Sequence, residues 1–165
     1  PRRTSLMTNF IGEFDCKLDA KGRLMMPSGL RKQLDPANKE TFVINRGFEP
    51  CLVLYPKNDW ERISAEVNQL NQYVKKNREF IRYFYRGATE LALDGNGRVL
   101  LPKRLQQYAG VEKEVVLFAY SDRIEVWDKD KYEGLLTDEP EDFANLAEEV
   151  MGNVNQKTGG DDGVS

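Results

Sequence analysis

Two stretches of this chain carry the same pattern: GEFDCKLDAKGRLMMPSGL at residues 12–30 and GATELALDGNGRVLLPKRL at residues 87–105. The matched positions hold turn, charged and strand-ending residues as well as apolar ones: Gly12/Gly87, Leu18/Leu93, Asp19/Asp94, Gly22/Gly97, Arg23/Arg98, Pro27/Pro102 and Leu30/Leu105. A shared hydrophobic pattern alone can recur by chance, but this combination indicates a tandem duplication. Each copy contains one Asp-x-x-x-Arg loop, so the chain carries this loop as a pair.

Each copy is expected to form a strand, a tight loop, a second strand, a short helix and two further strands. Glycine at the last position of the loop at residues 20–22 favours a hairpin that closes through a left-handed residue. Pro27 ends the returning strand and suits the first position of a short helix through Leu34. The expected strands of the first copy lie at residues 12–18, 23–26, 41–45 and 51–55, and the second copy repeats their order.

A single copy cannot close a barrel, because the edges of its sheet stay unpaired. Two copies can pair with each other. The duplication therefore predicts an α+β, mainly β fold, in which a pseudo-twofold β-barrel is built from two tandem copies with helices packed outside. Asn58-Asp59 is expected to cap the connecting helix. The expected parts are repeat 1 at 11–58, the connecting helix at 59–85, repeat 2 at 86–132, a C-terminal helix at 133–152 and a disordered tail at 153–165.

The composition argues against several classes of protein. No apolar run approaches the roughly 20 residues that a membrane span needs, so no membrane partner is predicted. Cys16 and Cys51 form no pattern typical of a disulfide framework or zinc site, which favours a reducing cytoplasm. The net charge of -3 is uneven, because residues 138–165 hold eight acidic residues and one basic residue, leaving +4 for the rest. The body therefore permits a polyanionic partner without requiring one.

Catalytic chemistry is poorly represented in the sequence. Histidine is absent, which removes the usual general base and the commonest zinc ligand. The duplicated aspartates, Asp19 and Asp94, could suggest two carboxylates that share a proton, but a neighbouring arginine would keep each of them ionised. We therefore predict no enzyme, and no cofactor, metal or small-molecule substrate.

The loop residues divide into an ordering set and a binding set. Asp19 and Asp94 can accept hydrogen bonds from the loop backbone, and Gly22 and Gly97 permit the turn, so an ordering role is favoured for these four residues. This interpretation needs no ligand.

The two loop arginines, Arg23 and Arg98, support a structural and a binding interpretation about equally. Each can pair with its aspartate only to fix the turn. A guanidinium held in this way is also preorganised to offer its other donors to a phosphate or a guanine edge. Lys21 adds a positive charge at the tip of the first loop, where Asn96 stands in the second, so the first loop is expected to bind anions better.

Basic residues also flank the loops. Arg31 and Lys32, with Lys103 and Arg104 in the second copy, could contact phosphates or could be solvated helix charges. Five basic and five aromatic residues interleave over residues 73–86, which resembles a base-stacking surface. A helix-to-strand junction with buried rings and exposed charges is the favoured interpretation of that segment.

The decads LDAKGRLMMP and LDGNGRVLLP, duplicated in a chain of this length, resemble the MraZ family of bacterial regulators, and the single unit is similar to the SpoVT/AbrB DNA-binding domain. The resemblance covers residues 11–132. It implies a swapped β-barrel of the SpoVT/AbrB type that assembles into a ring-shaped homo-oligomer. It also implies a sequence-specific transcriptional regulator of its own division and cell-wall operon, which binds short direct repeats in double-stranded promoter DNA at the nucleoid.

The family's paired motif corresponds to Asp19 with Arg23 and to Asp94 with Arg98, and Lys21 matches the basic loop position. The candidate DNA-binding residues are Lys21, Arg23, Arg31, Arg98, Lys103 and Arg104, and the loop-ordering residues are Asp19, Gly22, Asp94 and Gly97. The alternative function is a protein-interaction module, antitoxin-like or an assembly scaffold, that does not recognise promoters. In that case the acidic C-terminal region and the connecting helix would be the working surfaces.

Overall fold

The computed structural model describes residues 8–137 and 142–158. The chain divides into two compact units, Pro1–Tyr132 and Glu133–Ser165. In the described part of the chain, no helix combines the length and the apolar content needed to cross a membrane.

The first unit contains eight strands and four α-helices among its described residues. The strands are β1 (Phe10–Lys17), β2 (Arg23–Met25), β3 (Thr41–Arg46), β4 (Leu52–Pro56), β5 (Thr89–Ala92), β6 (Arg98–Leu100), β7 (Glu114–Ser121) and β8 (Arg123–Asp128). The helices are α1 (Ser28–Arg31), α2 (Lys57–Asn68), α3 (Lys75–Tyr85) and α4 (Lys103–Ala109), with a 3₁₀ turn at Pro36–Asn38. Helix α5 (Lys129–Thr137) begins at the end of this unit, and α6 (Phe143–Thr158) lies in the second.

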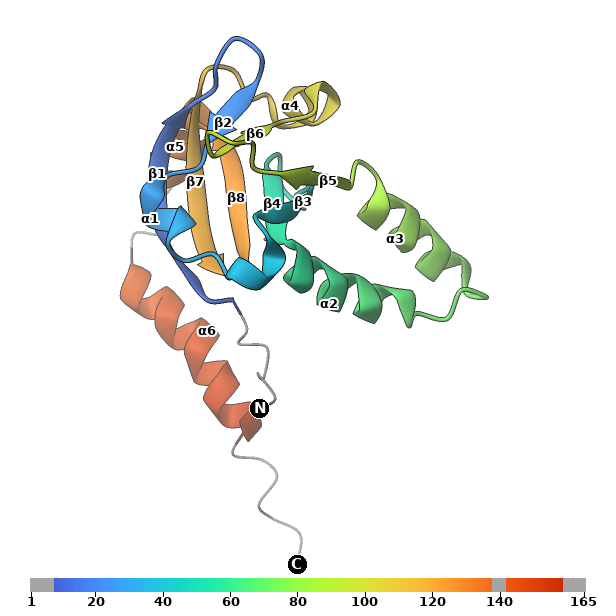
Figure 1. Cartoon of the computed structure of the whole chain (residues 1–165). Helices are drawn as coiled ribbons and strands as arrows, with labels where there is room; N and C mark the ends of the chain where they lie inside the picture. Colours follow the sequence, from blue (N-terminus) through green and yellow to red (C-terminus); the bar gives the residue numbers. More distant parts are fainter. Residues whose placement is uncertain (1–7, 138–141, 159–165) are drawn as a thin grey trace, which may run out of the picture. The chain divides into compact units, whose positions relative to one another are not determined.

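The sheets combine strands from both copies. Six antiparallel strands follow the order β1-β7-β8-β4-β3-β5, and β2 pairs with β6 in a separate two-stranded sheet (Figure 1). Exchanging each strand for its counterpart in the other copy reverses this order onto itself, as a pseudo-twofold axis requires. The pairs β1–β7, β3–β5, β4–β8 and β2–β6 all join one copy to the other. The prediction that the two copies pair with each other is confirmed.

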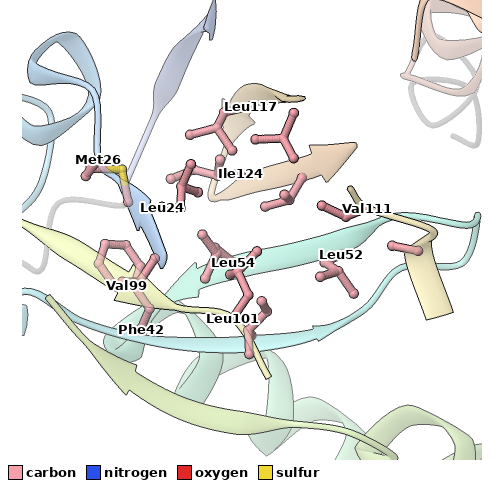
Figure 2. Close-up of a cluster of buried hydrophobic side chains, with 14 of the residues drawn as sticks. Leu24, Met26, Phe42, Leu52, Leu54, Val99, Leu101, Val111, Leu117 and Ile124 are labelled. Carbon is pink, nitrogen blue, oxygen red and sulfur yellow. The ribbon is translucent and has the colours of Figure 1, made fainter. Parts of the chain in front are cut away.

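One hydrophobic core lies between the two sheets. Leu24 of β2 and Val99 of β6 are fully buried, and they belong to the same cluster as Leu52, Leu54 and Ile124 of the large sheet. Figure 2 shows these side chains converging from both sheets. Because side chains alternate along a strand, the neighbours of Leu24 and Val99 are directed outward. The small sheet is therefore anchored by one face and presents the other.

The expected hairpin of each copy is formed only at its base. Leu18 makes an isolated bridge with Leu24, but the rest of the returning strand β2 pairs with β6 of the other copy. Strand β1 has β7 as its partner along its whole length, from Phe10 opposite Ser121 to Lys17 opposite Glu114. The pairing within one copy is thus replaced by pairing between copies.

The connecting helix expected at residues 59–85 is two helices, α2 and α3. The side chain of Asn71 accepts a hydrogen bond from the backbone N–H of Tyr73 at 3.0 Å, a local turn that competes with the helix. The expected cap at Asn58-Asp59 is also wrong, because α2 already begins at Lys57. Asn38 Oδ1 instead accepts from the Asn58 N–H at 2.9 Å. Asp59 is buried, accepts from the Thr8 hydroxyl, and has its pKa raised chiefly by burial.

The C-terminal helix expected at residues 133–152 is likewise two helices, α5 and α6. Helix α6 continues to Thr158, beyond the expected start of disorder at residue 153. It includes Gly152, whose cost within a helix is only about 1 kcal/mol and which does not end it. The expected tail at residues 159–165 lies outside the described residues.

Candidate nucleic-acid interface

The first loop is organised by the carboxylate of Asp19. Its Oδ1 accepts hydrogen bonds from the backbone N–H groups of Lys21 and Arg23, both at 2.9 Å. Its Oδ2 accepts from Arg23 Nε at 2.7 Å, and its carbonyl accepts from the Gly22 N–H at 3.0 Å. One side chain thereby fixes both the turn and the guanidinium.

The second loop repeats this arrangement. Asp94 Oδ1 accepts from the N–H groups of Asn96 and Arg98, both at 2.9 Å, and Oδ2 accepts from Arg98 Nε at 3.0 Å. These hydrogen bonds are the ones that the ordering role of the two aspartates predicted. The same geometry at matching positions of the two copies makes the loops structural equivalents.

Hydrogen bonding keeps both carboxylates ionised. The pKa of Asp19 is lowered first by the Arg23 backbone N–H, and that of Asp94 by the Arg98 backbone N–H, with the guanidinium hydrogen bonds and charges adding to the effect. A proton-sharing pair needs one carboxylate with a raised pKa. The loops are therefore unsuited to acid–base catalysis of that kind, and the described residues contain no group of three or more side chains that could hold a metal ion.

The last glycine of each loop joins the two copies. Gly22 and Gly97 have φ values of +82° and +76°, which side chains rarely tolerate. The Gly97 carbonyl accepts from the Met26 N–H at 2.9 Å, and the Gly22 carbonyl accepts from the Leu101 N–H at 3.0 Å. Each loop is thus hydrogen-bonded to the strand that leaves the other loop.

Each glycine is also covered by the short helix of the other copy. A Cβ on Gly22 would lie 2.4 Å from Gln106 Nε2 of α4, and one on Gly97 would lie 2.6 Å from Arg31 Nη1, at the end of α1. Residues 31 and 106 are equivalent positions in the two copies. Arg31 also pairs with Glu40 at 2.9 Å. Arg31, proposed from the sequence as a DNA contact, therefore supports the second loop in this structure.

The outer face of the small sheet carries the two loop arginines. In the register of β2 and β6, Arg23 lies opposite Leu100 and Arg98 lies opposite Met25. These four side chains alternate with the buried Leu24 and Val99, so they share the outward face. Met25 is 57% exposed and Leu100 is 54% exposed. The sequence analysis missed these two apolar residues, although their alternation with buried neighbours was a signal that could have found them.

The two arginines have unequal surroundings. Arg98 Nη1 lies 4.0 Å from Asp19 Oδ2 in addition to the Arg98 pair with Asp94, whereas Arg23 has Asp19 as its only ion-pair partner among the described residues. The terminal nitrogens of Arg23 are thus the freer of the two sets. Lys21 lies beside them at the exposed tip of the first loop.

The other basic candidates lie on α4. Lys103 and Arg104 are exposed on its first turn, directly after Pro102, and neither has an ion-pair partner in the described part of the chain. They remain candidates for phosphate contacts.

The doubled loop and its cross-copy pairing correspond to a known family. The family model for the MraZ protein, described as antitoxin-like, matches the chain twice, at residues 9–83 and 84–154. The chain belongs to the MraZ family. The two matched segments begin at positions 9 and 84, and the same offset relates Gly12 to Gly87 in the repeated pattern.

Proteins named transcriptional regulator MraZ are similar over most of the chain. The one from Christiangramia forsetii is 53% identical over 148 residues, which are 89% of this chain and 96% of that protein. The one from Flavobacterium psychrophilum is 49% identical over 150 residues, 90% of this chain and 96% of that protein. A more distant relative from Pediococcus pentosaceus is 38% identical over 142 residues, covering 86% and 96% respectively.

Proposed function

We propose that the chain is a sequence-specific DNA-binding transcriptional regulator that reads duplex DNA with the outer face of the β2–β6 sheet and its two loops. Membership of a family whose relatives are named transcriptional regulators supports the regulatory role. The observation that carries the DNA contact is the pair Arg23 and Arg98 on one exposed ribbon, each held through Nε by its own carboxylate.

The chemistry of this face suits a DNA groove. The major groove admits a two-stranded β-ribbon, and terminal guanidinium nitrogens pair with the O6 and N7 of guanine or with phosphates. Met25 and Leu100 add apolar surface between the arginines, which suits contact with the methyl group of thymine. Fixing each guanidinium in advance reduces the entropy lost on binding.

Binding through one subunit is expected to be weak. The body carries only +4, so few phosphates are neutralised and affinity falls steeply with salt. We infer that a ring-shaped homo-oligomer presents several loop pairs to short direct repeats in the promoter of the chain's own division and cell-wall operon. Linked contacts raise the effective concentration, so weak contacts combine. The protein would then act in the cytoplasm at the nucleoid, without catalytic activity.

Fluorescence anisotropy with fragments of the protein's own upstream DNA tests this proposal. A fragment with four repeats should bind far more tightly than one with a single repeat, and footprinting should protect evenly spaced sites. Equal affinities would contradict the combined binding. No preference for upstream DNA over scrambled DNA would favour the antitoxin-like or scaffold alternative.

The two arginines should contribute unequally. Arg23→Ala should weaken binding by about 5- to 150-fold, the range for one well-formed base contact of about 1–3 kcal/mol, and Arg98→Ala by less. The physical reason is that Asp19 as well as Asp94 lies near Arg98, while Lys21 reinforces Arg23. Lys113→Ala, which changes the charge equally at an exposed position away from the loops, is the control. The reverse order for two folded variants would contradict this reasoning.

A further inference from the structure

Helix α3 has an aromatic face and a basic face. On the aromatic face, Phe84 stacks on Trp60 of α2 with ring centroids 5.2 Å apart, and Tyr85 meets the same indole edge-on at 5.9 Å. Tyr83 is 66% exposed and takes no part in this stack. The expected junction with packed rings is therefore present for two of the aromatic residues, and it fixes which side of α3 is directed outward.

Four cations form a line on the outward side of α3. Lys75, Arg78, Arg82 and Arg86 are spaced by three, four and four residues, which places them one above another on a helix. We call these four residues the α3 stripe. All four are exposed, and at 1.5 Å per residue the line is about 16 Å long.

The charges of the α3 stripe have no counter-charge in the described part of the chain. None of the four side chains forms an ion pair there, and the only hydrogen bond given for them runs from Arg78 Nη1 to the Gln72 carbonyl at 2.8 Å. By contrast, Lys57 and Arg62 of the neighbouring helix α2 each have a carboxylate partner.

Helix stability does not explain this arrangement. Like charges three or four residues apart repel each other along a helix, and the α3 stripe contains three such steps. Lys75 lies in the first turn, where a positive charge opposes the helix dipole, and that turn contains no acidic residue. A row of cations that weakens its own helix is instead suited to a partner with regularly spaced negative charges.

We propose that the α3 stripe binds the phosphate backbone of duplex DNA next to the site read by the β2–β6 sheet. One DNA strand carries a phosphate about every 3.4 Å along the axis, so a row of about 16 Å faces about five of them. Arg86 precedes Asp94 of the second loop by eight residues, a path of at most about 29 Å. One turn of duplex is about 34 Å, so both surfaces can reach the same molecule.

The inference rests on the proposed DNA binding but names a different surface, which requires its own test. The variant Lys75→Gln with Arg82→Gln removes two charges of the α3 stripe. Neither side chain has a described hydrogen bond, and glutamine has a similar helix propensity, so the fold should persist. The control, Lys17→Gln with Lys113→Gln, removes the same charge from an exposed surface that also holds Glu112, Glu114 and Asp128.

The measurement is the dependence of DNA affinity on salt, for upstream and scrambled duplexes of about four helical turns. Each lost phosphate contact lowers the slope of log K against log salt by about one, so the stripe variant should lose about two per bound subunit while the control keeps the wild-type slope. The preference for upstream DNA should not change, because phosphate contacts carry no sequence information.

An unchanged salt slope in the stripe variant would overturn the proposal. So would an unchanged slope with an altered oligomeric state by sedimentation, which would identify the α3 stripe as a contact between copies of the chain. The proposed function fails differently, since it requires that the wild-type protein prefers upstream DNA and that Arg23→Ala removes this preference.

Discussion

Replacing Gly97 by alanine tests how tightly the two loops are locked together. Gly97 has a φ of +76°, and a Cβ there would lie 2.6 Å from Nη1 of Arg31, so a methyl group meets both a backbone and a steric obstacle. Arg31 would have to move, and its pair with Glu40 at 2.9 Å would weaken. The expected result is a loss of stability without a change of fold.

The size of the loss follows from these two contributions. A side chain in the left-handed region costs about 1–2 kcal/mol. The Arg31–Glu40 pair has both side chains 43% exposed, so weakening it adds only about 0.2–1 kcal/mol. The sum is about 2 kcal/mol, which for a chain of this size lowers the melting temperature by about 4–8 °C.

Urea denaturation at a fixed protein concentration measures this difference, with Gly95→Ala as the control. Gly95 lies in the same loop, lacks a positive φ, and has nothing within 4 Å of an added Cβ. Gly95→Ala should therefore be neutral or stabilise by up to about 1 kcal/mol. Equal stability of the two variants would refute the locking of the second loop by Arg31.

Two further predictions concern titratable groups. The folded-state pKa values of Asp19 and Asp94 are lowered, so their contribution to stability is present above the ordinary value of 3.8 and is lost as the pH falls through the folded values; Asp19→Asn with Asp94→Asn should flatten the acid branch of the unfolding free energy measured against pH. Burial, followed by the charge of Glu125, raises the pKa of Cys51 to about 12, and burial raises that of Cys16 to about 11. A disulfide reagent at pH 8 should therefore modify both thiols only slowly until urea is added, and fast labelling of Cys51 in the native protein would contradict its burial.

Much of this fold can be predicted from the sequence, because the duplication is written in residues with strict conformational roles. Glycine at the end of each loop and proline after each returning strand fix the boundaries of the repeated unit. The strands at residues 41–45 and 51–55 are β-branched and aromatic, and they appear as β3 and β4. Such local signals say which segments are extended.

Local signals do not say which strand pairs with which. Strand β2 is very short, and nothing in Arg23, Leu24 or Met25 distinguishes a partner in its own copy from one in the other. The break between α2 and α3 depends on the Asn71 side chain, which is compatible with a helix when it is directed to solvent. The support of each loop by the other copy's short helix is a long-range contact, which periodicity cannot report.

The pairing of β1 with β7 has a consequence for synthesis of the protein. Phe10 and Ser121 are partners although most of the first unit separates them along the chain. At roughly 5–20 residues per second, a ribosome needs about 6–22 seconds between making the first and the second. During that interval the backbone of the first strand is without its partner and open to other chains. The yield of native protein should therefore depend on translation speed and on protection of the nascent chain.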